Sequence, residues 1–257
     1  MNLRSISVDT RGIILSPHDM RERLGSLVYG GGSTMEQIAL ASQRGELQMD
    51  IACVIAGKYG IDAIKKAKKL KLPFEIVDQE KFRGDDGKVD EYGFGQAMLK
   101  VFRKYGATVV MQNGWLPRTP TIVIDAFPNM IFNQHPGPLP ETKAMHGVQP
   151  HAVMLYLTRA TGRNNGTEVI SQRVHANFDE GVIVGRAEVP IYVPHDTPKR
   201  LQKRALKVEH RLQIDVLKQV ADGTIKETLQ EYHYMKPGEE YILKSARKEA
   251  RKKYPNG

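Results

Sequence analysis

The segment from Asn133 to Pro140, which reads NQHPGPLP, holds side chains that could do chemistry. Asn133 and His135 stand one residue apart at the end of a predicted strand, where alternate side chains point to the same side. The three prolines and the glycine that follow predict a stiff, irregular loop. A carboxamide and an imidazole held side by side can stabilise an oxyanion and move a proton. Since a lone Asn-x-His pair is more often a hydrogen-bonded loop pair, this chemistry needs further partners.

Two other segments carry groups suited to binding or catalysis. The run from Gly30 to Ser33 lies between a predicted strand and a predicted helix, where backbone N–H groups at a helix N-terminus form an anion site. A plain tight turn is the alternative for this run. Asp179 precedes Gly181 in a predicted loop between two strands, where an aspartate is usually a turn residue. Beside a histidine, its carboxylate would favour the charged imidazolium.

Alternating strands and helices must position these groups. Apolar runs predict strands at 24–29, 50–56, 73–77, 107–113, 129–133, 166–175 and 182–191. Helical spacing predicts helices near 33–47, 61–72, 91–105, 147–160 and 197–222. Ser33, with Glu36 three residues later, predicts a capping box at the first helix. Thr197 followed by Pro198 predicts an N-cap and a first-turn proline at the last one.

This alternation predicts the fold class. It indicates an α/β fold with a doubly wound, mostly parallel sheet flanked by helices, which is Rossmann-like. In such sheets the ligand lies outside the C-terminal ends of the strands. Three candidate segments follow predicted strands, at 30–34, 112–115 and 133–135. We therefore expect them to meet at one cleft, with Asn133 at a strand end.

Composition narrows the class of protein. The 257 residues, 40% hydrophobic and 26% charged, suit one globular α/β domain, or one domain with an appendage. No apolar run approaches the roughly 20 residues that span a bilayer, and the N-terminus does not resemble a secretory signal. Cys53 is the only cysteine and lies in an apolar run, so we expect a small core residue in a reducing cytoplasm.

The charge distribution points to anionic ligands. The net charge of +9 favours phosphates, folate glutamates or nucleic acid. Much of the excess is local, because residues 244–253 carry six basic side chains and one acid. We interpret this run as a solvated helix end or tail rather than a nucleic-acid arm.

The sequence resembles the glycinamide ribonucleotide formyltransferase family in five segments that keep their order from about 24 to 227. The run NQHPGPLPETKAMHG resembles the family's catalytic Asn-x-His-x-Ser-Leu-Leu-Pro and the Gly-x-His that follows, with His146 eleven residues after His135. Forty-four residues after His135, FDEGVI resembles the Asp-x-Gly-x-x-Ile loop of the catalytic aspartate. YGGGSTMEQI resembles the phosphate loop, MQNGWL the Leu-Ala-Gly-aromatic-Met segment, and HDTPKRLQKRALKVEHRL the final helix.

The resemblance implies a folate-dependent formyltransferase of one-carbon metabolism. Such an enzyme transfers a formyl group from 10-formyltetrahydrofolate to a primary amine, here glycinamide ribonucleotide in purine biosynthesis, without a metal. It implies three catalytic residues, namely Asn133, His135 and Asp179. The residues it assigns to the substrate are Gly31, Gly32, Ser33 and Thr34 for a phosphate and Glu209 for ribose hydroxyls. Those it assigns to the folate are Trp115, Leu116, Pro117, Thr119, Asn133, Ala176, Asn177, Phe178 and Asp179.

Some of these assignments have an alternative when the residue is taken by itself. Glu209 on a helix is usually a solvated face residue. Trp115, the only tryptophan, could equally be a core residue.

Several positions depart from the family pattern. Gly137 and Pro138 stand where Ser-Leu is usual, and Thr34 replaces an asparagine of the phosphate loop. Pro117 stands where an arginine is common, and Glu91 aligns with an arginine that contacts ligand. The missing cations could be replaced by Arg118 or Arg83. The stretch between His135 and Asp179 is also longer than in the family, near 158–175.

The sequence is compatible with other functions. The same three residues could hydrolyse 10-formyltetrahydrofolate with water as acceptor, and RGELQMDI and Asp179-Glu180-Gly181 resemble such hydrolases. These usually carry an N-terminal regulatory domain, for which the residues before Leu24 are few. A sugar-nucleotide amine formyltransferase is a further alternative. Methionyl-tRNA formyltransferase adds a C-terminal domain that is larger than the segment after the last long helix here.

A ligand-binding module with a decayed site conflicts with the three intact catalytic positions. A metal site of His135, His146 and Asp179 lacks standard ligand spacing. We expect an N-terminal extension at 1–23, the formyltransferase domain at 24–227, and a C-terminal extension with a basic tail at 228–257. We expect a cytoplasmic monomer or homodimer that binds a small-molecule amine with a ribose phosphate, and neither membrane nor nucleic acid.

Overall fold

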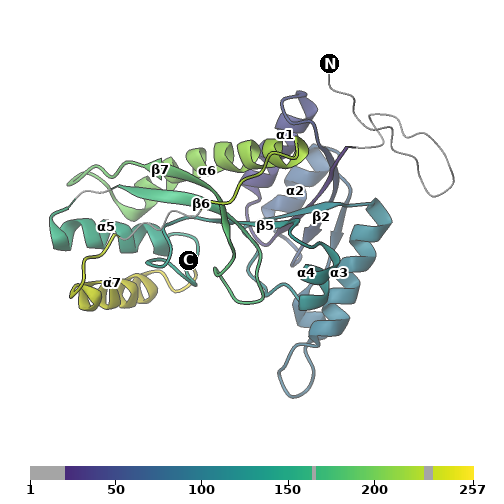
Figure 1. Cartoon of the computed structure of the whole chain (residues 1–257). Helices are drawn as coiled ribbons and strands as arrows, with labels where there is room; N and C mark the ends of the chain where they lie inside the picture. The colour runs from purple at the N-terminus through teal and green to yellow at the C-terminus, as the bar shows by residue number, and fades with distance from the viewer. Residues whose placement is uncertain (1–20, 164–165, 229–233) are drawn as a thin grey trace.

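The computed structural model describes residues 21–163, 166–228 and 234–257 and contains a seven-stranded sheet in the order β3-β2-β1-β4-β5-β6-β7 (Figure 1). The strands are β1 (Arg23–Val28), β2 (Asp50–Ala56), β3 (Phe74–Ile76), β4 (Val109–Asn113), β5 (Ile131–His135), β6 (Thr167–Arg173) and β7 (Ile183–Val189). Strands β1 to β5 are parallel to one another. Strand β6 pairs antiparallel with β5, and β7 pairs antiparallel with β6. The predicted mostly parallel, doubly wound sheet is confirmed.

Helices cover both faces of this sheet. They are α1 (Ser33–Gln43), α2 (Asp62–Lys69), the 3₁₀ turn η1 (Gln79–Phe82), α3 (Glu91–Tyr105), α4 (Thr121–Ala126), α5 (Gln149–Thr161), α6 (Pro198–Ala221) and α7 (Glu240–Lys253). The alternating side chains of β4 show which helices lie on which face. Val109 and Met111 pack with residues of α1 and α6, whereas Val110 packs with α3 and α4. Figure 1 shows α1 and α6 on one side of the sheet and α3 and α4 on the other.

The single cysteine lies in the core. Cys53 is fully buried on β2, among apolar residues of the layer under α3. Burial raises the pKa of its thiol to about 12. An unreactive core residue was predicted, and the structure confirms it.

The two predicted helix starts have different outcomes. Thr197 accepts a hydrogen bond from the backbone N–H of Arg200 at 3.3 Å, and Pro198 is the first residue of α6, as predicted. The capping box at α1 is wrong, because the N-cap residue is Gly32 and it makes no side-chain cap. Gly32 has a φ of 63°, and a Cβ there would lie 2.6 Å from the Cβ of Ala63. This left-handed turn makes Ser33 the first helical residue instead of the cap.

The C-terminal segment is more than a solvated tail. Helix α7 packs against α5, and Ala246 and Ala250 are buried in that contact, while most basic side chains of α7 are exposed (Figure 1). The sequence did not predict α4 or η1, which are only 6 and 4 residues long. Most of the predicted 1–23 extension lies outside the described residues, and the predicted domain boundaries stay a prediction.

Candidate active site

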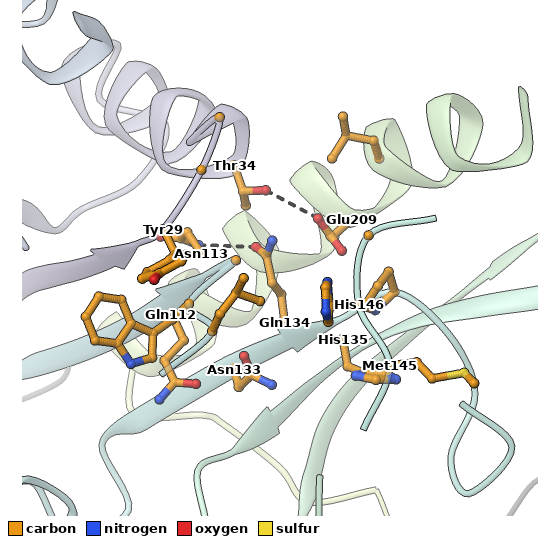
Figure 2. Close-up of a pocket in the computed structure, with 18 of the residues that line it drawn as sticks. Tyr29, Thr34, Gln112, Asn113, Asn133, Gln134, His135, Met145, His146 and Glu209 are labelled. Atoms are coloured by element: carbon orange, nitrogen blue, oxygen red, sulfur yellow. Dashed lines mark hydrogen bonds between the residues drawn. The ribbon is translucent and has the colours of Figure 1, made fainter. Parts of the chain in front are cut away.

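A cavity of about 530 Å³ lies outside the C-terminal ends of β1, β4 and β5. The chain order reverses between β1 and β4, and such a switch point is where doubly wound sheets bind ligands. The three candidate segments 30–34, 112–115 and 133–135 all line it, as do residues of α6. In Figure 2, Thr34 and Glu209 lie on one side of the cavity, and Asn133 and His135 lie on the other.

Strand β5 positions Asn133 and His135. The strand ends at His135, two residues beyond the predicted end, so Asn133 lies within it. Both side chains therefore point to one face, as the spacing predicted. Across the antiparallel ladder, Asn133 stands opposite Gln172 of β6. This register puts the Gln172 side chain on the same face as Asn133 and His135.

Asp179 reaches these residues from the loop between β6 and β7. It has a φ of 55°, which is uncommon for a residue with a side chain. Its Oδ1 lies 3.3 Å from Nδ1 of His135 and accepts a hydrogen bond from Nε2 of Gln172 at 2.9 Å. Its Oδ2 accepts from the backbone N–H of Ala144 at 2.9 Å. The structure thus brings Asn133, His135 and Asp179 to one wall of the cavity.

The surroundings of Asp179 favour its charged form. Burial by itself raises the pKa of this carboxyl, but the hydrogen bond and positive charge of His135 oppose burial. The donors Ala144 and Gln172 act in the same direction as His135, and the pKa ends below its usual value. Asp179 is therefore an anion at neutral pH that faces the imidazole of His135.

Both ring nitrogens of His135 have partners. Nδ1 faces Asp179, and Nε2 lies 2.9 Å from Oγ1 of Thr142. The ring is only 3% exposed, although it lines the cavity. A second histidine, His151 of α5, lines the same cavity and is 1% exposed. Burial and the charge of His135 lower the pKa of His151 to about 4, so His151 is neutral.

The glycine loop and α6 form the opposite wall. Residues Gly31 to Thr34 line the cavity at the start of α1, where the first backbone N–H groups have no partner within the helix. Oγ1 of Thr34 donates to Oε1 of Glu209 at 3.3 Å (Figure 2). Oγ of Ser33 lies 3.2 Å from Nε2 of His210. This wall therefore offers an anion site beside a carboxyl group.

Glu209 is not a solvated face residue. It is 4% exposed, and burial raises the pKa of its carboxyl to about 7 despite the hydrogen bond from Thr34. A glutamate held partly neutral at the edge of a cavity is typical of a site that binds a polar ligand. The helical pattern alone favoured exposure, and packing of α6 against α1 overrides it.

The residues predicted to bind folate divide between this cavity and a neighbouring one. Leu116 lines the large cavity, as does Trp115, which also stacks on Phe94 with ring centroids 6.3 Å apart. Trp115 is therefore both a core residue and a cavity wall. A smaller cavity of about 30 Å³ adjoins it, and its lining includes Pro117, Thr119, Asn133, Ala176, Asn177, Phe178 and Asp179.

One of the two arginines considered as replacement cations lies at this site. Arg118 lines the small cavity, donates from Nε to the carbonyl of Ala176 at 3.1 Å, and has Nη1 3.9 Å from Glu91. Arg83 instead pairs with Glu80 at 2.7 Å, and neither cavity includes it in its lining. Of these two arginines, the geometry favours Arg118 as the replacement cation beside the predicted folate residues.

The sequence pattern did not predict several residues of the site. Gln172 had a signal, because the alternation along β6 sets its face once the pairing with β5 is known. Thr142 and Ala144 had none, since an irregular loop has no period. Gln134 points away from Asn133 on β5 and accepts from Nδ2 of Asn113 at 3.3 Å (Figure 2). Its polar type at a cavity-lining position was the available clue.

The described residues contain no group of three or more His, Cys, Asp and Glu side chains placed to hold a metal ion. None of their helices is long and apolar enough to cross a membrane.

Comparison with known proteins gives consistent matches. Residues 22–217 match the formyl transferase family. The chain is 28% identical over 208 residues to the chloroplastic phosphoribosylglycinamide formyltransferase of Arabidopsis thaliana, covering 80% of this chain and 68% of that protein. Its structure resembles glycinamide ribonucleotide transformylase 1 from Symbiobacterium toebii, with a TM-score of 0.68 and 24% identity over 81% of this chain and 90% of the other. It also resembles a formyltetrahydrofolate deformylase from Pseudomonas syringae, with a TM-score of 0.66 and 16% identity. This match covers 80% of this chain and 63% of the other.

Proposed function

The chain belongs to the formyl transferase family, and we propose that it transfers the formyl group of 10-formyltetrahydrofolate to the primary amine of glycinamide ribonucleotide, a step of purine biosynthesis. One observation carries the proposal. A single cavity joins the cluster of Asn133, His135 and Asp179 to the N-terminus of α1 and to Glu209. It therefore offers a reaction centre and a phosphate and ribose site in one space.

In this proposal, Asn133 stabilises the tetrahedral intermediate. The neutral amine attacks the formyl carbon, and the formyl oxygen becomes an oxyanion. The side-chain N–H of Asn133 donates to that oxygen, held by β5 so that little reorganisation is needed. His135 adds positive charge to the same region and helps to protonate the departing folate nitrogen.

Asp179 has two tasks in this mechanism. Its carboxylate holds His135 charged across the contact of 3.3 Å. A carboxylate offers about four acceptor positions, and the contacts from His135, Gln172 and Ala144 occupy three of those on Asp179. The fourth is open to a water molecule that takes a proton from the attacking amine.

The acceptor amine binds through its phosphate and ribose. Backbone N–H groups of Gly31, Gly32, Ser33 and Thr34 hold the phosphate at the start of α1, where the helix dipole favours negative charge. Glu209 accepts from the ribose hydroxyls, which compensate for its burial by donating to its oxygens. Thr34 still offers a hydroxyl where the family has an asparagine, and it already contacts Glu209.

The folate binds where the two cavities meet. Trp115 and Leu116 form one wall, and residues 176–179 form the other, beside Pro117 and Thr119. The small cavity, at about 30 Å³, is far smaller than a bicyclic ring. Phe178, which lines both cavities and is 53% exposed, therefore moves aside to admit the pterin and then packs against it.

The proposal extends to the setting of the protein. We place it in the cytoplasm as a monomer or homodimer that acts on small molecules without a metal or nucleic acid. The single cysteine of the sequence, Cys53, cannot form an intramolecular disulfide, which fits a reducing compartment.

An absorbance assay of 10-formyltetrahydrofolate turnover tests the proposal. The assay uses glycinamide ribonucleotide, a panel of sugar-nucleotide amines, and a control without amine. Turnover that requires glycinamide ribonucleotide is expected. Equal turnover without any amine would replace transfer by hydrolysis, and turnover with another amine alone would replace the acceptor.

A further inference from the structure

The hydrogen-bond partners of His135 indicate which of its ring nitrogens carry a hydrogen. The hydroxyl of Thr142 donates its single hydrogen to the carbonyl of Pro138 at 2.7 Å. Its oxygen, 2.9 Å from Nε2 of His135, can then only accept, so Nε2 carries a hydrogen. On the other side of the ring, the carboxylate of Asp179 can only accept as well, so Nδ1 carries a hydrogen. A ring protonated at both nitrogens is an imidazolium.

Space for this contact depends on Gly137. A Cβ at that position would lie 2.7 Å from Oγ1 and 2.9 Å from Cγ2 of Thr142, which is closer than such contacts allow. The serine that is usual here in the family would therefore displace the Thr142 side chain. Gly137 and Thr142 are thus coupled, and the departure at Gly137 has a physical reason.

The contact is built into the interior of the loop. Thr142 is 0% exposed and His135 is 3% exposed, so water does not compete for their hydrogen bond. The backbone N–H of Thr142 also donates to the carbonyl of Pro138 at 3.0 Å, which fixes the threonine to the loop. The titratable groups that face the ring are Asp179, which is charged, and His151 of α5, which is neutral.

We propose that Thr142 is a positioning residue of the reaction, which holds His135 as an imidazolium with its ring plane fixed between two acceptors. This rests on the proposed formyl transfer only in the part that concerns rate. Both ring N–H groups are engaged in the resting site, so His135 acts first through its charge. Its Nε2 proton reaches the departing folate nitrogen only after the bond to Thr142 is exchanged for one to the folate.

Thr142→Val tests this because valine has nearly the same shape and lacks the acceptor. We expect kcat to fall about 10- to 100-fold, the range for a hydrogen bond to a charged group, with little change in either KM. Thr142→Ser should restore most of kcat. The matched control is Thr167→Val, since the buried hydroxyl of Thr167 has no partner among the described residues, and kcat should not change.

Nitrogen-15 NMR of the His135 ring supplies a readout that does not depend on activity. In the wild-type protein near neutral pH, both ring nitrogens should show the signals of a protonated imidazolium. In Thr142→Val, and in Gly137→Ala where a Cβ displaces Thr142, one nitrogen should lose its proton or the ring signals should broaden. A wild-type ring with one unprotonated nitrogen would overturn the proposal even if neither variant folds.

The two proposals fail in different ways. If the wild-type protein shows no formyl transfer but its ring is an imidazolium that depends on Thr142, only the proposed function is lost. If transfer is normal and Thr142→Val keeps kcat in a folded protein, the positioning role is wrong.

Discussion

Oδ1 of Asp179 lies 3.3 Å from Nδ1 of His135, and both side chains are less than one-tenth exposed. Breaking a buried pair by removal of one partner leaves the other charge uncompensated, which costs about 3–5 kcal/mol. The pair is therefore both a structural and a chemical element of the site.

Alanine at Asn133, His135 or Asp179 should each reduce kcat by roughly 10²-fold or more, because each removes charge or a donor aimed at the transition state. A folate analogue should still bind, and steady-state kinetics with calorimetry measures both. Since the three act on one intermediate, a double variant should lose much less than the product of the single losses. A folded His135→Ala protein with near-normal kcat would contradict the catalytic assignment.

Glu209→Gln should change how stability depends on pH. The pKa of Glu209 is raised from its ordinary value to about 7, so the folded state holds its proton more tightly than the unfolded state. This contribution is complete below the unfolded pKa of about 4.3 and is lost as pH rises through about 7. Glutamine stays neutral and can still accept from Thr34. The variant should match the wild type near pH 4 and exceed it above pH 7 by at most about 4 kcal/mol.

Denaturant unfolding over that pH range measures the difference for Glu209. Two stability curves that run parallel from acid to alkaline pH would show that the buried carboxyl is not perturbed.

Gly32→Ala should destabilise the protein by at least about 1 kcal/mol, because φ is 63° and a Cβ would clash with Ala63. It should also weaken binding of glycinamide ribonucleotide, which calorimetry measures. Gly30→Ala is the control, since nothing lies within 4 Å of a Cβ there. Equal stability of the two variants would show that the left-handed turn is not required.

Phe178→Ala should weaken binding of a folate analogue by roughly 10-fold, the effect of one lost aromatic contact. Trp115 is the only tryptophan and lines the cavity, so its fluorescence reports binding. Val182→Ala serves as the control, because Val182 is an exposed residue close to the same loop that lines neither cavity. If the Trp115 fluorescence does not change at a saturating concentration of the analogue, Trp115 is not part of the folate site.

Arg247→Met should reduce kcat several-fold, although Arg247 lies on α7, outside the residues that match the family. Its Nη2 donates to the carbonyl of Lys143 at 2.8 Å, and the next residue, Ala144, donates to Asp179. Loss of this contact should loosen the loop that orients the carboxylate. Arg251→Met, at an exposed position on α7, should have no effect, and similar kinetics for both variants would dismiss the role of α7.

Local patterns were enough to predict the elements and part of the site. Apolar periodicity placed the strands and the helices α1, α2, α3, α5 and α6 within a few residues, because period and turn chemistry are properties of adjacent residues. The strand that carries Asn133 and His135 put both on one face for the same reason. The cap at Thr197 followed from its own side chain and the proline beside it.

Only the tertiary structure decided which groups meet and which are buried. The register of β5 with β6 set Gln172 opposite Asn133, and the loop after β6 carried Asp179 to His135 across 44 residues. Packing of α6 against α1 buried Glu209, which its helical pattern alone would have exposed. Burial, protonation state and hydrogen-bond partners depend on segments distant in the chain, and a pattern of neighbouring residues does not contain that information.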